Sequence, residues 1–320
     1  MTEIILDVDT GVDDALAILF AVRHPDLRVR AITCVAGNAD VDQVVANTLR
    51  VLDAAGAPDI PVARGADSPL LEPRRDARHV HGTDGMADLG LPVSERRAVD
   101  VHAVELLRRE IMAAPTPVTL ITLAPLTNIA LLLRTYPEVT GKLARIMTMG
   151  GSASVGNASA VAEFNVWHDP EAAAIVFGAG LPVTMYGLDV FYSVAVPRAT
   201  AEKLAASDEP GTALAGRLLT FVSDRYGHDH RIPEPNGAGL GDAGAVCAVV
   251  DPAGLTTRTL PVTVALHDRL TRGQTVVDHR NVAGEDAAHG MIDDRAAVAV
   301  ALGVDGPRYR DLFLSAVARD

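Results

Sequence analysis

The sequence predicts an α/β fold with an open, mostly parallel sheet flanked by helices and a binding crevice at the carboxyl ends of the strands. Runs rich in Val, Ile and Thr alternate with helix-length segments, which is the order of successive βα units. In open parallel sheets, ligands bind outside the carboxyl ends of the strands. With 320 residues and 48% hydrophobic content, the chain can bury a large core. We therefore expect a single domain over residues 1–320.

The first half of the chain carries the clearest strand and helix signals. The expected strands are "IILDVD" (4–9), "RVRAITCVAG" (28–37), the start of "VTLITLAPLTNIALLL" (118–133), "ARIMTMGG" (144–151) and "LPVTMYGLDV" (181–190). Helices are expected from Asp13 to His24, within 40–56 and in the second part of 118–133. A further helix is expected at 169–180, because Asp169 can cap its first turn and glycines can end its last.

The second half is expected to hold helical pieces around 199–225, a helix from Asp242 to Val250, two antiparallel strands near 259–278 and a closing helix near 306–318. Two stretches lack any periodicity, residues 64–97 and 223–241. Long irregular segments in a compact α/β domain are commonly active-site loops. We expect both to border the crevice.

Charge and composition narrow the class of partner. The net charge of −13 and the lack of a basic stripe argue against a nucleic-acid partner. No apolar run reaches the roughly 20 residues of a membrane span, and no leader is evident, so we expect a cytoplasmic protein with no membrane partner. Cys34 and Cys247 both lie in apolar contexts, which predicts buried thiols and no disulfide framework.

Four carboxylates crowd the stretch "EIILDVDTGVDDALAI" at 3–18. The helix macrodipole accounts for Asp13 and Asp14, which fall in the first turn of a helix. It does not account for Asp7 and Asp9, at the end of a buried strand. Carboxylates this close repel one another unless a cation holds them, so the pattern favours a divalent ion bound by oxygen.

Two classes of enzyme fit this beginning. The "DVDTG" loop resembles that of haloacid-dehalogenase-like phosphatases, in which Asp7 would be the nucleophile and Asp9 the acid/base on Mg²⁺. That class also needs a Lys for the phosphoryl group, and the chain has only Lys142 and Lys203, neither in a convincing context. The second class has a longer signature, which "DVDTGVDDALAI" matches in full.

The longer match resembles the inosine–uridine-preferring nucleoside hydrolase family. Further matching segments follow in the family's order: "ITCVAGN" (32–38), "VHGTDG" (80–85), "LAPLTNIALLL" (123–133), "MGGSASVGNASAVAEFNVWHDPEAA" (149–173) and "LTRGQTVVD" (270–278). The resemblance implies the nucleoside hydrolase fold, a tightly bound Ca²⁺ and hydrolysis of the N-glycosidic bond of a small-molecule ribonucleoside. It also implies homodimers or homotetramers and a role in nucleoside salvage and catabolism.

Residue by residue, the resemblance implies a Ca²⁺ site made of Asp9, Asp14, Asp242 and the backbone carbonyl of Leu123. Asp9 corresponds to the general base, which takes a proton from a Ca²⁺-bound water as that water attacks the anomeric carbon. A non-catalytic Ca²⁺- and ribose-binding protein would use the same ligands, and this alternative stays open.

The remaining matches concern the sugar. Asp13 and Asn38 would contact the ribose or the water, and Met149 would lie beneath the sugar. Asn157, Glu163 and Asn165 match the hydroxyl-binding residues, with Asn157 and Glu163 nearest the 5′-hydroxyl. His81 is either a substrate contact or a structural loop residue.

One position departs from the family pattern. Members often carry His directly before the last Ca²⁺ aspartate, where it protonates the leaving base, whereas this chain has Gly241. The candidates to replace that acid are Tyr226, His228 and His230 in the preceding loop. We favour His228, because it lies in the middle of the loop and imidazole titrates near neutral pH. The preference between purine and pyrimidine bases cannot be predicted from these residues.

Overall fold

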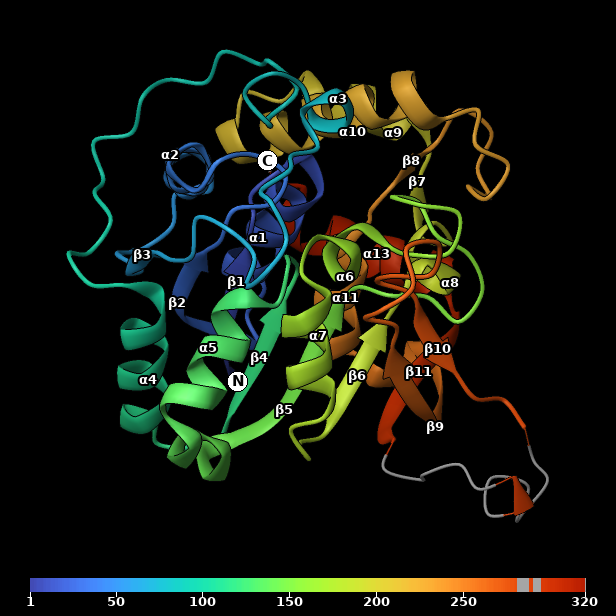
Figure 1. The fold of residues 1–320 in the computed structure, drawn as a ribbon. Coiled ribbons are helices and arrows are strands. Elements are labelled where there is room, and N and C mark those ends of the chain that lie inside the picture. The colour runs from blue at the N-terminus through green and yellow to red at the C-terminus, as the bar shows by residue number, and fades with distance from the viewer. Residues whose placement is uncertain (281–287, 290–294, 320) are drawn as a thin grey trace.

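The computed structural model describes residues 1–280, 288–289 and 295–319. In this part of the chain, one nine-stranded sheet has the order β10-β9-β11-β6-β5-β4-β1-β2-β3. The pairs from β3 to β11 are parallel, and β9 runs antiparallel to both β11 and β10. The predicted open, mostly parallel sheet is thus confirmed (Figure 1).

The strands of this sheet are β1 (Thr2–Val8), β2 (Leu27–Cys34), β3 (Val62–Arg64), β4 (Val118–Thr122), β5 (Leu143–Met149), β6 (Val183–Tyr186), β9 (Leu255–Val264), β10 (Thr275–Val277) and β11 (Ala296–Val304). A second, two-stranded sheet joins β7 (Ala195–Val196) to β8 (Ala238–Gly239).

The helices are α1 (Val12–Arg23), α2 (Val41–Ala54), α3 (Arg78–His81), α4 (Ala103–Ala113), α5 (Thr127–Thr135), α6 (Phe164–His168), α7 (Pro170–Phe177), α8 (Leu188–Phe191), α9 (Arg198–Ala205), α10 (Pro210–Tyr226), α11 (Asp242–Val250) and α13 (Gly306–Val317). Short 3₁₀ helices are η1 (Pro137–Lys142) and η2 (Pro252–Gly254). Among the described residues, no helix is both long and apolar enough to cross a bilayer.

Two hydrophobic cores lie on opposite faces of the sheet. Alternation along β1 sends Ile4 and Leu6 into one core and Ile5 into the other, all fully buried. The first core packs against α1, α2, α10, α11 and α13, and the second against α4, α5 and α7, which line one face of the sheet in Figure 1. Helices on both faces leave the ends of the strands as the place for a site. Cys34 and Cys247 are buried free thiols, as predicted.

Most expected elements are present close to their predicted bounds, and three differences matter. The strand expected at 181–190 ends at Tyr186, and Leu188–Phe191 is a helix. The chain turns at Gly187, where a Cβ atom would lie only 2.7 Å from the carbonyl oxygen of Gly151. The strand β11 was not predicted, and neither was α4.

The irregular segment 64–97 is held in place by arginines from other parts of the chain. Arg272 pairs with Glu72 (2.5 Å), and Arg217 donates to the carbonyl of Leu89 (2.9 Å). Arg225 donates to the carbonyl of His79, which brings α3 against α10 (Figure 1). Within the segment, Arg96 pairs with Asp53 of α2 (2.7 Å).

Candidate active site

Four neighbouring strands bring predicted site residues to one edge of the sheet. The strands β5, β4, β1 and β2 are adjacent, and Gly150, Leu123, Asp9 and Asn38 lie just beyond their carboxyl ends. The backbone N–H of Asn38 donates to Asp9 Oδ2 at 2.7 Å, which ties the ends of β1 and β2 together.

Asp14 closes the turn between β1 and α1. Its carboxylate accepts from the backbone N–H groups of Asp9 (3.2 Å) and Gly11 (2.9 Å) and from the side-chain amide of Asn38 (3.3 Å). Burial, followed by the charge of Asp13, nevertheless raises the pKa of Asp14 to about 7. The carboxylate is held in place by hydrogen bonds, but within the described part of the chain no cationic side chain pairs with it.

The acidic cluster consists of Asp13, Asp14 and Asp242, whose nearest oxygens all lie within 4.8 Å of one another. Asp242 is the first residue of α11 and is buried. Burial first, and then the charges of Asp13 and Asp14, raise its pKa well above the usual value. The metal site predicted from the sequence consisted of Asp9, Asp14, Asp242 and the carbonyl of Leu123. The structure groups Asp14 and Asp242 with Asp13, which was not among the predicted ligands.

Two buried oxygens here have no hydrogen-bond partner among the described residues: Asp13 Oδ1, within the cluster, and Asp9 Oδ1, beside it. Burial and the neighbouring charge of Asp14 raise the pKa of Asp9. A buried carboxylate oxygen without a partner costs free energy unless it binds a cation or a proton. A set of hard carboxylate oxygens of this kind fits Ca²⁺, which prefers oxygen ligands.

Glu163 and Asn165 form the adjoining polar wall. Glu163 caps α6 and accepts from the backbone N–H groups of Gly151 (2.9 Å), Asn165 (2.9 Å) and Val166 (3.2 Å). Burial raises the pKa of Glu163 to about 7.

Asn165 ties this wall to the ends of β4 and β5. Its side-chain amide donates to the carbonyls of Leu123 (3.0 Å) and Met149 (3.1 Å). Asn157 is exposed, and its Oδ1 accepts from the N–H of Phe164 (2.9 Å).

His81 lies against the acidic cluster. It is buried, its Nδ1 accepts from the N–H of Val12 (3.2 Å), and the same atom is 3.8 Å from Asp13 Oδ1. Burial lowers the pKa of His81, so the ring is neutral near pH 7 and its proton is on Nε2. The ring therefore has both a structural contact and a position beside the predicted site.

The three loop candidates for the leaving-group acid differ in their contacts and exposure. Tyr226 donates its hydroxyl to the carbonyl of Val80 at 3.3 Å, next to His81. His228 is exposed, and the side chain of His230 is 94% exposed. The exposed histidines are therefore not seated among the buried groups of the site.

Both the backbone conformation and the lack of free space favour glycine at position 241. Its φ is +55°, which favours glycine, and a Cβ atom there would lie 2.8 Å from Phe191 Cζ and 3.0 Å from Asp13 Cβ. The ring of Phe191 fills the space that any side chain at position 241 would need. The departure from the family pattern thus comes with an aromatic residue packed in its place.

Sequence reasoning missed the aromatic pair Phe191 and Tyr192, whose rings meet edge-to-face at 5.0 Å, and Arg231, which lies over Tyr192. The available signal was their position shortly after β6, at the same sheet edge as the predicted residues. The strand was expected to run to residue 190, and no role was predicted for the residues that follow it.

Asp7 is placed as a structural residue. It is 1% exposed, and its Oδ1 accepts from the Thr33 hydroxyl (2.6 Å) and the Asn128 amide (2.8 Å). Burial raises its pKa to about 7. Lys142 lies in η1, just before β5 and so at the opposite end of the sheet. This arrangement does not present Asp7 as a nucleophile beside a phosphate-binding Lys.

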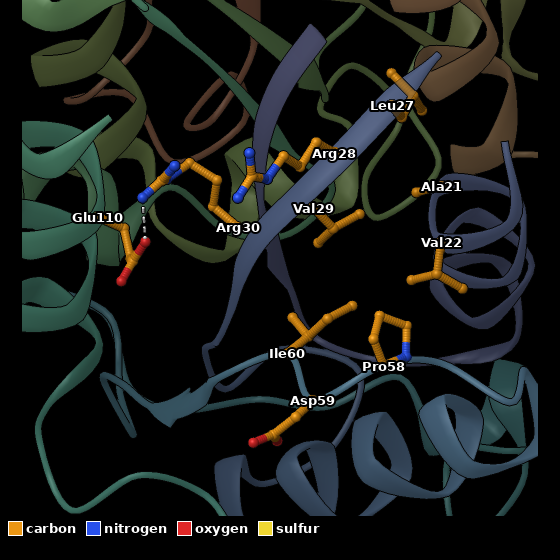
Figure 2. Close-up of a pocket in the computed structure, with 10 residues that line it drawn as sticks. All are labelled: Ala21, Val22, Leu27, Arg28, Val29, Arg30, Pro58, Asp59, Ile60 and Glu110. Carbon is orange, nitrogen blue, oxygen red and sulfur yellow. Dashed lines mark hydrogen bonds and ion pairs between the residues drawn. The ribbon is translucent and has the colours of Figure 1, made fainter. Parts of the chain in front are cut away.

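A cavity of about 390 Å³ lies away from this edge. Its lining includes Leu27 and Val29 from the amino-terminal half of β2, Ile60 before β3 and the paired Arg30 and Glu110 (Figure 2). Because it opens at the amino ends of the strands, it is separate from the site described above.

The family model described as "Inosine-uridine preferring nucleoside hydrolase" matches residues 4–311. The chain belongs to the inosine–uridine preferring nucleoside hydrolase family. The predicted family and fold are confirmed, and with them the function of a ribonucleoside hydrolase. The phosphatase reading of "DVDTG" is not supported.

The sequences of relatives can be aligned with most or nearly all of this hydrolase. It is 38% identical over 317 residues to the pyrimidine-specific ribonucleoside hydrolase RihA of Shewanella sp. strain ANA-3, covering 98% of this chain and 96% of that one. It is 40% identical over 281 residues to the RihA of Salmonella arizonae, covering 88% and 90%.

Solved structures give the same result. The plant nucleoside hydrolase PpNRh1 superposes with a TM-score of 0.90 at 30% identity, covering 99% of each chain. The purine-preferring ribonucleoside hydrolase from Gardnerella vaginalis superposes with a TM-score of 0.87 at 30% identity, covering 99% of this chain and 98% of that one.

Proposed function

We propose that this chain cleaves the N-glycosidic bond of pyrimidine ribonucleosides, with Asp9 as the general base and Ca²⁺ held by the carboxylates around it. The observation that carries the proposal is the pair of buried oxygens without partners, Asp9 Oδ1 and Asp13 Oδ1, beside Asp14 and Asp242. A site that binds a cation and takes up a proton explains why such oxygens are retained.

The residues proposed to hold Ca²⁺ are Asp9, Asp14, Asp242 and the carbonyl of Leu123, with Asp13 close by. When bound, Ca²⁺ would supply a positive charge that orients the sugar hydroxyls and lowers the pKa of the attacking water. The hydrogen bonds to Asp14 hold its carboxylate in a fixed orientation for this purpose.

The two oxygens of Asp9 have different surroundings. Its Oδ2 accepts from the N–H of Asn38, which fixes the carboxylate, and its Oδ1 has no partner and is free to accept a proton from the attacking water. A raised pKa suits a general base, because it brings proton affinity nearer to neutral pH.

The sugar is proposed to lie against Asp13, Asn38, Met149, Asn157, Glu163 and Asn165. The bond to the base breaks as positive charge develops on the ribose, and the surrounding carboxylates stabilise that charge. Asn165 is held by two backbone carbonyls, so it can position a hydroxyl without reorganising. His81 and His228 are the proposed proton donors toward the base.

The preference for pyrimidine bases is inferred from relatives. The matches at 38–40% identity are named pyrimidine-specific, whereas structures named for purine or for inosine and guanosine match at 30–31%. The test is a reducing-sugar assay with uridine, cytidine, inosine, guanosine and adenosine. We expect the first two to be hydrolysed fastest. Release of ribose from none of them would support the alternative of a non-catalytic Ca²⁺- and ribose-binding protein.

The family resemblance also supports a homodimer or homotetramer that works in the cytoplasm in nucleoside salvage and catabolism. Light scattering of the purified protein measures the first part of this proposal. A monomeric mass would contradict it.

A further inference from the structure

An aromatic pair follows β6 at the same edge of the sheet as the acidic cluster. Phe191 ends α8, and a Cβ atom at Gly241 would lie 2.8 Å from Phe191 Cζ on one side and 3.0 Å from Asp13 Cβ on the other. The ring of Tyr192 meets Phe191 edge-to-face at 5.0 Å. Both side chains are only partly buried. Tyr192 therefore lies one aromatic ring away from the acidic cluster and faces partly outward.

The loop 223–241 also contacts Tyr192, through Arg231. The guanidinium carbon of Arg231 lies 3.9 Å from the centre of the Tyr192 ring. The same guanidinium donates hydrogen bonds to the carboxylate of Asp229 from Nε (2.9 Å) and from Nη2 (2.5 Å). A guanidinium fixed in this way stacks well on an aromatic face and restricts the rotation of the ring.

The hydroxyl of Tyr192 hydrogen-bonds with the side chain of Asn157, in the sugar-binding wall. Burial is the main cause that raises the pKa of the phenol, the bond with Asn157 lowers it, and the nearby charge of Glu163 adds a smaller rise. Because Asn157 Oδ1 already accepts from the N–H of Phe164, its amide nitrogen is the atom available to donate to the phenol oxygen. The phenol keeps its own proton to donate.

We propose that Tyr192 is a further substrate-binding residue, whose hydroxyl completes the subsite for the ribose 5′-hydroxyl together with Asn157 and Glu163, and that Arg231 is a positioning residue for its ring. The inference rests on the proposed function, which gives Asn157 and Glu163 to that end of the sugar. It adds a donor from α8 and assigns a task to the loop 223–241 that does not involve the leaving base.

The test removes one hydroxyl from the enzyme and one from the substrate. Tyr192→Phe should lower kcat/KM for uridine by about 3- to 10-fold, the usual effect of one hydrogen bond, while leaving kcat/KM for 5′-deoxyuridine nearly unchanged. Arg231→Ala should shift the ratio of kcat/KM for uridine to kcat/KM for 5′-deoxyuridine in the same direction. Arg231→Lys, which keeps a cation over the ring, should restore part of it.

Tyr136→Phe is the matched control, because Tyr136 also lies under an arginine, Arg108 at 5.3 Å, but between α5 and η1 at the opposite end of the sheet. Tyr136→Phe should leave kcat/KM unchanged for both substrates. An equal loss on uridine and 5′-deoxyuridine in Tyr192→Phe would overturn the inference, since a purely structural role affects both alike.

A failure of the proposed function gives a different result. In that case wild-type protein hydrolyses neither substrate, and calorimetry then compares binding of D-ribose and 5-deoxy-D-ribose to wild type and Tyr192→Phe. Weaker binding of ribose alone in the variant supports the inference, and equal changes for the two sugars overturn it.

Discussion

At the scale of single residues, Asp9 is the most informative position. Asp9→Asn keeps the acceptor for the N–H of Asn38 but removes the oxygen that can take a proton, so kcat should fall by roughly 10² or more while the fold survives. Steady-state kinetics and thermal unfolding measure the two parts. Asp59→Asn, at the cavity in Figure 2, is the control and should be neutral. Near-normal turnover in Asp9→Asn would show that another group is the base.

Glu163 links a single residue to the pH dependence of stability. Its pKa in the folded protein is about 7, above the ordinary 4.5, so the folded state binds its proton more tightly than the unfolded state does. The resulting stability is complete below about pH 4.5 and is lost as the pH rises through about 7. In metal-free protein, the free energy of unfolding should therefore fall between about pH 5 and pH 8.

The comparison that isolates this effect is Glu163→Gln, which has no proton to lose and should show a shallower fall over the same range. Glu95→Gln changes an exposed carboxylate and should follow wild type. Denaturant unfolding at several pH values supplies the data. Parallel curves for wild type and Glu163→Gln would contradict the assignment.

At the scale of elements, the start of α11 tests why glycine stands at 241. Gly241→Ala combines a strained φ with overlap against Phe191 and should destabilise the protein by about 2–4 kcal/mol. Gly56→Ala has a similar φ of +61° but no atom within 4 Å of the new Cβ, so it should cost only about 1–2 kcal/mol. Equal losses in thermal stability for Gly241→Ala and Gly56→Ala would mean that Phe191 moves aside without a measurable loss of free energy.

The loop 223–241 carries the second prediction at this scale. A nitrophenyl riboside leaves as a stabilised anion and needs no proton, whereas uridine gains from general acid catalysis, typically about 10²–10⁴-fold. His228→Ala, His230→Ala or Tyr226→Phe should therefore slow uridine hydrolysis and spare the nitrophenyl substrate. If all three variants keep the wild-type rate on uridine, the acid does not come from this loop.

The same elements show how far the sequence alone could be interpreted. The helix α1 was predictable, because Asp13 and Asp14 directly follow a strand and acidic residues favour the first turn of a helix. The end of β6 was not, since the turn at Gly187 depends on its close approach to Gly151, 36 positions earlier (187 − 151). The strand β11 is rich in Ala, which favours helix, and it is a strand because it pairs with β9 and β6.

The candidate site also contains residues that the sequence predicted and residues that it did not. Asp9 and Asn38 were predicted as site residues because motif order and strand ends both indicate them, and Glu163 was predicted from the motif alone. Tyr192 and Arg231 were not found, because their contact joins α8 to a loop almost 40 residues further along the chain. Nothing in either local sequence indicates that packing.

At the scale of the whole molecule, the metal should contribute to stability as well as to activity. Removal of the proposed Ca²⁺ would leave Asp13, Asp14 and Asp242 facing one another, so chelation should lower both the rate and the melting temperature. At a free Ca²⁺ concentration of 100 Kd, binding adds about 2.7 kcal/mol to the free energy of unfolding. Metal analysis of active protein, together with melting in chelator and in added Ca²⁺, gives the result. Active protein without a bound divalent ion would contradict the proposal.

The arginines around residues 64–97 have a consequence for binding. The contacts of Arg272, Arg217 and Arg225 fix this long irregular segment to elements on both sides of it. A segment held in this way has already lost its conformational entropy in the free protein. Ordering it takes little from the affinity for a nucleoside, so we expect the segment to act at the proposed site as a preorganised wall rather than as a lid.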